Sequence, residues 1–235
     1  MNINLNQFIE IVRSRRSTRH FQSKAVPTEL LQELLEATRW SPSAFNLQPT
    51  HFVVVTDQSI KEKLYPACMN QRQVLEAGAV VVFTGDRHVV EHNFERVLKQ
   101  DHDAHANSEK YEQLLRKNVP LSFNRGFLGL GWLWKAMAEM IVGRFIPIPK
   151  LQAVHRDYWL AKQAAIAAQT FMLAAEVAGL STCPMEGFSE RAVQKALNIP
   201  SDQAVILVIP VGYADNSKQT KTRLPLSDVV HQNGW

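Results

Sequence analysis

Short apolar runs rich in β-branched residues predict the strands of this chain. They lie at Phe52–Val55, Ala79–Phe83 and Ala204–Ile209. Within these runs the apolar residues follow one another without polar alternation, which is typical of strands buried on both faces. We therefore expect a sheet that is covered on both sides.

Apolar residues at helical spacing predict the helices. A leucine-rich segment gives one apolar face to a helix that opens at Pro27-Thr28 and stops at the turn Trp40–Ser43. The alanine-rich segment Asp157–Gly179 is apolar nearly all round, so we expect a long, central, buried helix there. Further helices are predicted at Phe8–Arg15 and Phe188–Leu197.

The order of these elements favours an α+β fold. A long and mainly helical segment, residues 87–156, separates strands that a regular βαβ repeat would join by short crossovers. A dinucleotide-binding fingerprint is missing, because Trp134 stands at the third glycine position of the run that starts at Gly129. We expect residues 1–235 to form a single domain, with about 87–156 as a variable helical part.

The most apolar stretch, Phe127–Pro149, does not predict a membrane span. A span needs about 20 predominantly apolar residues, and Lys135, Glu139 and Arg144 interrupt this stretch. We interpret it as a buried or lid-like helix. The N-terminus also lacks the pattern of a signal peptide. We therefore expect a cytoplasmic protein without a membrane partner.

Composition narrows the possible functions further. The two cysteines, Cys68 and Cys183, lack the paired spacing of a disulfide framework or a zinc knuckle. The formal net charge is +4, with basic clusters at Arg13–Arg19 and Lys218–Arg223. A small anion such as phosphate explains these two clusters as well as a nucleic acid does, and the other charges are scattered. We expect no nucleic-acid partner.

Four segments carry side chains suited to binding a small ligand. The guanidinium groups of Arg15–Arg19 can bind phosphate bidentately. Prolines fix the loop Ser41–Pro49, whose polar side chains can hold the edge of a ring. Gly187, at the end of Cys183–Gly187, allows close backbone approach, and Lys221–Arg223 is a second basic site. Taken singly, the arginine run is better explained as a solvated basic face, and the loop Ser41–Pro49 as an ordinary connecting turn.

Motifs for other chemistry are weak. His88 and His92 belong to an H-x-x-E-H pattern and would share one face of a helix, as zinc ligands do. A third ligand is not evident, so we expect no metal. The chain has no nucleophile elbow and no P-loop, which leaves hydrolase and NTPase readings without a motif.

Taken together and in order, these segments resemble the FMN-dependent nitroreductase family, especially the bacterial oxygen-insensitive NAD(P)H nitroreductases. The resemblance covers most of the chain. Each motif is weak alone, but six in the right order are a strong signal. The anchors are Arg15–Arg19, Ser41–Pro49 with the strand after it, Asn70–Phe83, Trp159–Gln163, Pro184–Gly187 and Lys221–Arg223.

The resemblance implies a nitroreductase-like α/β sandwich, with a mostly antiparallel central sheet flanked by helices, in an intertwined homodimer with one FMN at each end of the interface. The residues implied on the phosphate and ribityl side are Arg15, Arg16, Ser17, Arg19, Lys221 and Arg223. Those implied along the ring are Asn70, Gln73, Pro184, Met185, Glu186 and Gly187, with the Glu186 backbone N–H near flavin N5. The partner chain would supply Pro42, Ser43, Ala44 and Asn46.

The chain departs from the family pattern at three positions. The family often has a lysine at the position of Gln73, where a positive charge stabilises the reduced flavin and an amide can only hydrogen-bond. Ala44 replaces a common serine, and Thr50 replaces a common aromatic residue. We expect these changes to affect rate and substrate range more than flavin binding.

The resemblance also implies an activity, namely ping-pong transfer of electrons from NAD(P)H through FMN to a nitroaromatic, a quinone or a similar small acceptor. No side chain stands out as an essential acid or base, so we assign no catalytic residue. Two alternatives stay open. One is other flavin chemistry of the same superfamily, such as reductive dehalogenation or flavin fragmentation, and the other is a non-enzymatic flavin-binding protein.

Overall fold

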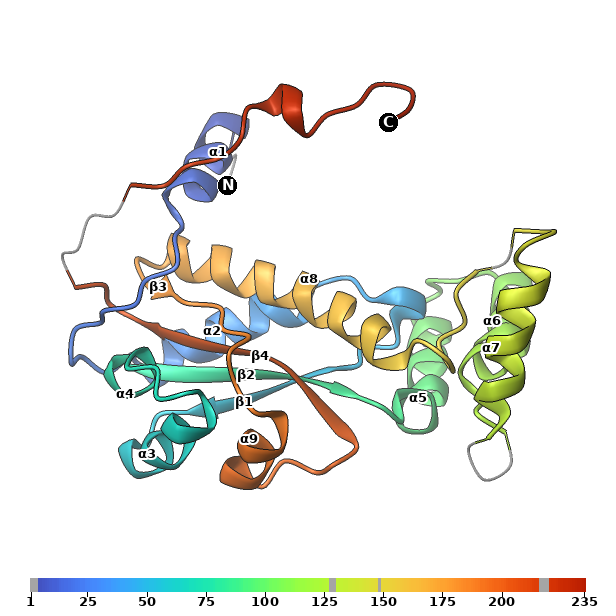
Figure 1. The fold of residues 1–235 in the computed structure, drawn as a ribbon, viewed down its shortest axis with the longest axis horizontal. Helices are drawn as coiled ribbons and strands as arrows, with labels where there is room; N and C mark the ends of the chain where they lie inside the picture. Colours follow the sequence, from blue (N-terminus) through green and yellow to red (C-terminus); the bar gives the residue numbers. More distant parts are fainter. Residues whose placement is uncertain (1–3, 127–129, 148, 216–219) are drawn as a thin grey trace.

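A four-stranded antiparallel sheet forms the centre of the molecule (Figure 1). The computed structural model describes residues 4–126, 130–147, 149–215 and 220–235. In spatial order the strands are β1 (Thr50–Val55), β2 (Ala79–Asp86), β4 (Gln203–Gly212) and β3 (Ser181–Thr182). The α+β class and the mostly antiparallel central sheet expected from the sequence are thereby confirmed.

Helices cover both faces of this sheet, with further helices at its ends. They are α1 (Leu5–Ser14), α2 (Thr28–Arg39), η1 (Ala44–Asn46), α3 (Gln58–Ala67), α4 (Gln73–Glu76), α5 (Val89–Asp103), α6 (Glu109–Phe123), α7 (Gly131–Val142), α8 (Arg156–Val177), α9 (Glu190–Leu197) and η3 (Leu226–Asp228). Asn4 and Gln7 start α1 with a capping box, in which each side chain accepts the other's backbone N–H.

The side chains of β2 alternate between two cores. Val80 and Val82 point toward α3 and α9, where they join Leu64 and Val193. The neighbouring residues of β2 point to the opposite face, toward α2 and α8. There the ring of Phe83 packs edge-on against the rings of Phe52 and Phe171. All of β2 is buried, as its unbroken apolar run predicts.

A third core lies beyond the end of the sheet, where α5 and α6 pack against the N-terminal half of α8. Its centre is the pair Phe123 and Trp159, whose ring centroids lie 5.0 Å apart. The helix α7 follows α6 at this end of the molecule (Figure 1). None of its residues is buried, so the buried interpretation of the apolar stretch is wrong for α7. Residues 127–129 and 148 of that stretch lie outside the described residues.

The predicted strands and the long central helix are confirmed, whereas α3 and α4 were not predicted. Along the described ranges, no helix is long and apolar enough to cross a membrane. The assignment of residues 1–235 to one domain stays a prediction.

We expect Gly85→Ala to destabilise the sandwich. A Cβ at Gly85 would lie 2.9 Å from Cβ of the fully buried Leu160, so β2 and α8 would have to move apart. Overpacking of this kind costs about 1–3 kcal/mol. Urea denaturation measures the loss. Gly234→Ala, whose Cβ would meet no atom within 4 Å, is the matched control. A G85A variant as stable as the parent would show that α8 is not held tightly on β2.

Candidate functional site

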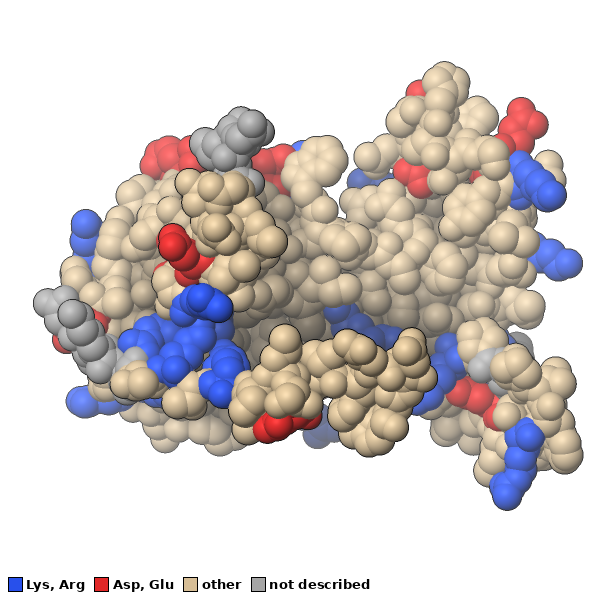
Figure 2. All heavy atoms as spheres, turned by 90° about the horizontal axis from the view of Figure 1, so that it is seen from above, with Lys and Arg blue, Asp and Glu red and all other residues tan. Residues whose placement is uncertain are grey.

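Basic residues from the two ends of the sequence line one cavity. Arg15, Arg16 and Arg19 lie on one wall, and Lys221 and Arg223 on the other, around about 260 Å³. Hydroxyl side chains complete the lining, which holds no carboxylate among the residues that the structure describes; they are Ser17, Thr220 and Thr222. Figure 2 shows Lys and Arg side chains gathered at the end of the molecule that carries helix α1. We call these eight residues the basic cavity.

Lys221 holds the two walls of the basic cavity together. Its ammonium donates hydrogen bonds to the backbone oxygens of Val12, Arg13 and Arg15, at 3.0, 2.7 and 2.6 Å. These carbonyls end helix α1, where a cation is favoured by the helix dipole. Burial, together with the nearby cations Arg15 and Arg223, lowers the pKa of Lys221. Lys221 therefore positions the arginine run as well as adding charge to the cavity.

The basic cavity is joined to the segment Pro184–Gly187 through strand β3. Ser17 forms a parallel bridge with Thr182, and the backbone N–H of Thr18 donates to the Thr182 oxygen at 2.9 Å. The chain then runs on from β3 to Met185, which forms an antiparallel bridge with Val208 of β4. The sheet thus places two of the predicted segments side by side.

The segment Asn70–Gln73 reaches the same region from the end of α3. Asn70 has a left-handed backbone with φ 53°, which turns the chain after the helix. The amide of Gln71 donates to the Gly187 oxygen at 2.8 Å, and a Cβ on Gly187 would lie 3.0 Å from that amide nitrogen. The buried Gln73 donates to the side-chain oxygen of Gln71 at 3.0 Å. Asn70, Gln73 and Gly187 therefore lie together.

Cys183 is the nucleophilic side chain closest in sequence to this region, and its surroundings keep it protonated. Burial raises the pKa of the Cys183 thiol, although the cations Arg19 and Arg15 and a hydrogen bond with Gln73 oppose the rise. A thiol in this state is a poor nucleophile at neutral pH.

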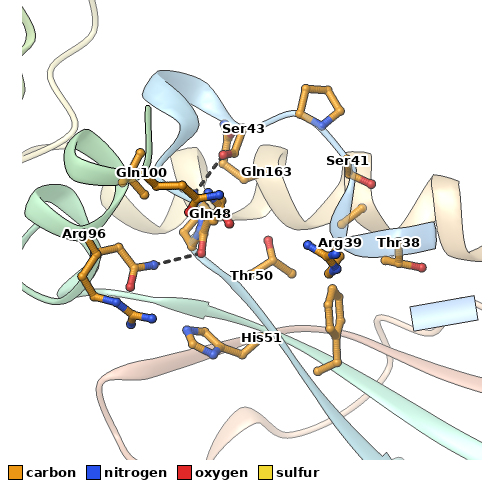
Figure 3. Close-up of a pocket in the computed structure, with 16 residues that line it drawn as sticks. Thr38, Arg39, Ser41, Ser43, Gln48, Thr50, His51, Arg96, Gln100 and Gln163 are labelled. Atoms are coloured by element: carbon orange, nitrogen blue, oxygen red, sulfur yellow. Dashed lines mark hydrogen bonds between the residues drawn. The ribbon is translucent and has the colours of Figure 1, made fainter. Parts of the chain in front are cut away.

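The fourth predicted segment lies elsewhere, at the N-terminal half of α8. The backbone N–H of Ala44 donates to the side-chain oxygen of the buried Gln163 at 2.9 Å, and Asn46 donates to Asp101 at 3.1 Å. Pro42 and Ser43 line a separate cavity of about 270 Å³, which Figure 3 shows with Ser43 beside Gln48 and Gln163. We call residues 42–48 the α8 loop.

The α8 loop has an unusual backbone. Phe45, Asn46 and Gln48 all have positive φ angles, of 58°, 53° and 51°. This conformation is uncommon outside glycine and costs free energy for an aromatic residue such as Phe45. Hydrogen bonds from the Asn93 amide to the Leu47 and Gln48 oxygens, at 3.0 and 3.1 Å, hold the loop in place.

One chain does not bring the basic cavity and the α8 loop together. Arg15 contacts the sulfur of Met172 on α8 at 3.9 Å, whereas the loop is bonded to Gln163 on the same helix. Nine residues of helix separate these two contacts by about 13 Å along the axis. The predicted set therefore divides into two groups, with Pro42, Ser43, Ala44 and Asn46 in one and the remaining twelve residues in the other.

Several residues of these two regions were not among the predicted site residues. Gln71 and Gln163 both orient a predicted segment through an amide, and the hydroxyls of Thr220 and Thr222 line the basic cavity. Gln163 carried a partial signal, because it is one of only two polar residues in the alanine-rich run Ala161–Ala168.

The histidine pattern at the start of α5 lies beside a carboxylate of strand β2. His92 lies 2.7 Å from the buried carboxylate of Asp86, which raises the pKa of His92. His88 has its ring centroid 6.2 Å from that of His92. No group of three or more His, Cys, Asp or Glu that could hold a metal ion occurs in the part of the chain that the structure describes.

Comparison with known proteins identifies the family. The model of the nitroreductase family matches residues 12–213. The chain belongs to the nitroreductase family. This confirms the resemblance that the sequence motifs indicate, and it agrees with the sandwich fold.

The chain is similar over most of its length to members of this family and to a solved structure. MhqN of Bacillus subtilis, provisionally named an NAD(P)H nitroreductase, is 30% identical and covers 93% of this chain and 92% of its own length. The oxygen-insensitive NAD(P)H nitroreductase of Enterobacter cloacae is 27% identical over 94% of this chain and 97% of its own. A structure from Exiguobacterium sibiricum, solved in complex with FMN, has a TM-score of 0.74 at 22% identity, covering 99% of this chain and 100% of its own.

We expect Gln163→Leu to loosen the α8 loop. The leucine keeps the side-chain bulk but removes the acceptor of the Ala44 N–H, a hydrogen bond worth about 1 kcal/mol. Hydrogen exchange of residues 43–47, followed by mass spectrometry, should become roughly five- to tenfold faster. Lys162→Leu, at the exposed neighbouring position, is the control. Unchanged exchange in Q163L would show that Asn93 and the buried Leu47 hold the loop without Gln163.

Proposed function

We propose that this protein is an FMN-dependent oxidoreductase that transfers electrons from NAD(P)H to a nitroaromatic, a quinone or a similar small acceptor. The observation that carries the proposal is the basic cavity, in which residues 15–19 and residues 220–223 meet. Cations that converge from both ends of a chain on one cavity, without a carboxylate in its lining, fit an anionic ligand group.

The basic cavity has the chemistry of a phosphate site. Arginine guanidinium groups bind phosphate oxygens in pairs, and hydroxyl groups add single hydrogen bonds. Arg15, Arg16, Arg19, Lys221 and Arg223 would hold the FMN phosphate, with Ser17 on the ribityl side. The names of the relatives and the FMN bound in the Exiguobacterium structure favour FMN over other anions as the ligand of this cavity.

The neighbouring segments fit the edge of a flavin ring. The bridge between Ser17 and Thr182 places Pro184–Gly187 directly after the basic cavity. Gln71 lies so close to Gly187 that a larger residue at position 187 would press against its amide. Asn70, Gln73, Pro184, Met185, Glu186 and Gly187 would line the ring, with the Glu186 backbone N–H as a donor near N5.

The α8 loop would complete the site from a second copy of the chain. Within one chain the loop contacts α8 at Gln163, nine residues from the contact that Arg15 of the basic cavity makes with Met172. In an intertwined homodimer the partner's loop can meet the basic cavity instead. Pro42, Ser43, Ala44 and Asn46 would then contact the flavin of the other subunit, held in a fixed conformation by the α8 contacts.

The protein's part in the reaction is binding and orientation. FMN, when bound, supplies the hydride and electron transfer of two successive half-reactions, with NAD(P)H as the donor and the acceptor following it. The basic cavity would anchor one end of the cofactor. We assign no side chain as an essential acid or base.

We expect Arg15→Ala and Arg223→Ala each to weaken FMN retention by roughly ten- to a hundredfold, the effect of losing a charge-assisted hydrogen bond. Equilibrium dialysis against free FMN measures the loss, and Arg191→Ala on α9 is the control. The parent protein should be yellow and should oxidise NAD(P)H when nitrofurazone or a quinone is added. A colourless parent that cannot be reconstituted with FMN would contradict the proposed function. Tight FMN binding by both variants would contradict only the assignment of the basic cavity as the phosphate site.

We expect Gln73→Lys to raise the midpoint potential of the bound flavin. Gln73 is a neutral amide in the position proposed for the N1–O2 edge, and a cation there stabilises the anionic reduced ring. Spectroelectrochemistry measures the potential, and Gln73→Met, which is uncharged and of similar size, is the control. A potential that moves equally in both variants would mean that packing and not charge is responsible.

A further inference from the structure

Two glutamine side chains around the start of α4 are fixed in one orientation by backbone carbonyls. The amide nitrogen of Gln71 donates to the backbone oxygens of Cys68 and Gly187, at 3.1 and 2.8 Å. A carbonyl only accepts hydrogen bonds, so the nitrogen of Gln71, and not its oxygen, must face both. The side-chain oxygen of Gln71 is therefore turned the other way, toward Gln73.

The amide of Gln73 has to match this orientation. Its nitrogen lies 3.0 Å from the side-chain oxygen of Gln71, which can only accept. Burial raises the pKa of the Cys183 thiol, and a hydrogen bond with Gln73 opposes the rise, as a bond donated to the sulfur does. Both N–H groups of Gln73 are thus used within the chain, and its side-chain oxygen is the group left for a ligand. We call the pair Gln71 and Gln73 the amide relay.

The amide relay resists reversal. Turning Gln73 over would place its oxygen against the oxygen of Gln71, and turning Gln71 as well would place an oxygen against two backbone carbonyls. Each such contact sets one acceptor against another and leaves both without a donor. Gln73 is only 6% exposed, so little water reaches it to supply the missing donor. The fold therefore determines that Gln73 offers its acceptor end.

The backbone on either side of the amide relay is also fixed. Before it, Met69 and Asn70 have positive φ angles of 54° and 53°, which turn the chain out of α3. After it, the buried Lys61 donates to the backbone oxygen of Ala77 at 2.6 Å, just beyond the last residue of α4. Helix α4 is only four residues long, so these two attachments set where Gln73 lies.

Two cations of the basic cavity act in this region. Burial raises the pKa of the Cys183 thiol, and Arg19 and Arg15 oppose the rise through their charge. In the loaded protein the FMN phosphate, with a charge of about −1.5 to −2, would offset both of these cations. Arg72 adjoins Gln73 in sequence, but its side chain is exposed.

Acidic side chains stand on the same segments. Glu76, at the far end of α4, lies 3.8 Å from His20, and Glu186 is exposed. In the described part of the chain, the side chains that hydrogen-bond with Gln73 are the Gln71 amide and the Cys183 thiol. Both are uncharged at neutral pH, so the bonds that hold Gln73 are those of neutral groups.

A fixed acceptor distinguishes between two protonation states of a reduced flavin. This step rests on the proposed function, in which Gln73 lies at the N1–O2 edge of the ring. NAD(P)H becomes NAD(P)⁺ by transferring a hydride, which carries two electrons and one proton, to N5. A second proton, taken from water, gives a neutral ring with an N1–H donor, and without that proton the ring is an anion with a lone pair on N1. The Gln73 oxygen accepts from the N1–H and repels the lone pair.

We propose that Gln71 is a positioning residue, which fixes Gln73 as a hydrogen-bond acceptor so that the protein holds the reduced flavin in its neutral form, protonated at N1. A lysine at the same position, as the family often has, would favour the anion instead. The replacement of lysine by Gln73 then changes the number of protons taken up with each electron pair, and not only the potential.

The test is the pH dependence of the midpoint potential of the FMN-loaded protein, measured by spectroelectrochemistry. Uptake of two protons with each electron pair makes the potential fall twice as steeply with rising pH as uptake of one proton. The slope halves at the pH where N1 loses its proton, which we call the break. We expect the break of the parent to lie at least about one pH unit above that of free FMN, the effect of one hydrogen bond made to a single protonation state.

Variants of the amide relay separate the roles of its two members. Gln71→Met keeps the bulk of the side chain but releases Gln73, whose N–H can then turn to N1, so the break should fall by about half a pH unit or more. Gln73→Lys should bring the break below that of free FMN. Gln58→Met, at the exposed first residue of α3, is the matched control and should keep the break of the parent.

A second measurement tests the amide relay without flavin. In the FMN-free, full-length protein with isotope-labelled glutamine, NMR should show the side-chain amide protons of Gln73 exchanging with solvent at least about tenfold more slowly than those of Gln58. In the Gln71→Met variant this protection should be lost. The result for the parent stands even if the Gln71 variant fails to fold.

Three results would overturn the proposal. A break of the parent at or below that of free FMN, or a break unchanged by Gln71→Met, would do so while leaving the proposed function intact. Amide protons of Gln73 that exchange as fast as those of Gln58 would show that the amide relay does not form. A parent that binds no FMN would contradict the proposed function itself, and the role of Gln73 would fall with it.

Discussion

The burial of strand β2 on both faces is the constraint from which the rest of the molecule follows. All eight of its residues are buried, so each face of the sheet needs its own apolar layer. The layer that contains α8 crosses the whole sheet, because the helix is 22 residues long. Its two halves then support different regions. Met172 contacts Arg15 of the basic cavity, and Gln163 accepts a hydrogen bond from Ala44 of the α8 loop.

This division is the basis of our proposal that the α8 loop serves the site of a second copy of the chain. The basic cavity depends on contacts among residues that are remote in sequence but neighbours in the fold: Lys221 on the end of α1, and Thr182 beside Ser17. The α8 loop depends on local strain that Gln163 and Asn93 offset. Both regions are bonded to the same helix, so their contacts with α8 lie nine residues apart.

The sequence predicted the elements whose pattern matches their burial, and missed those whose pattern does not. The runs in β2 and β4 are apolar because both faces are covered. In α3 the pattern is reversed: Lys61 is buried, donating to the Ala77 oxygen at 2.6 Å, while Ile60 is exposed. The apolar composition of α7 suggested burial, yet its charged residues take the inner positions. The sequence motifs identified the segments of the proposed site. Which of these segments lie close together is seen only in the fold.

The bonds from Lys221 to the end of α1 have a consequence for biosynthesis. A chain leaves the ribosome from its N-terminus, so residues 15–19 emerge long before residues 220–223. Until the later segment is free, α1 lacks the cation that caps its final carbonyls, and the cavity has only one wall. Any ligand that needs both walls can therefore be bound only after residues 220–223 have been synthesised.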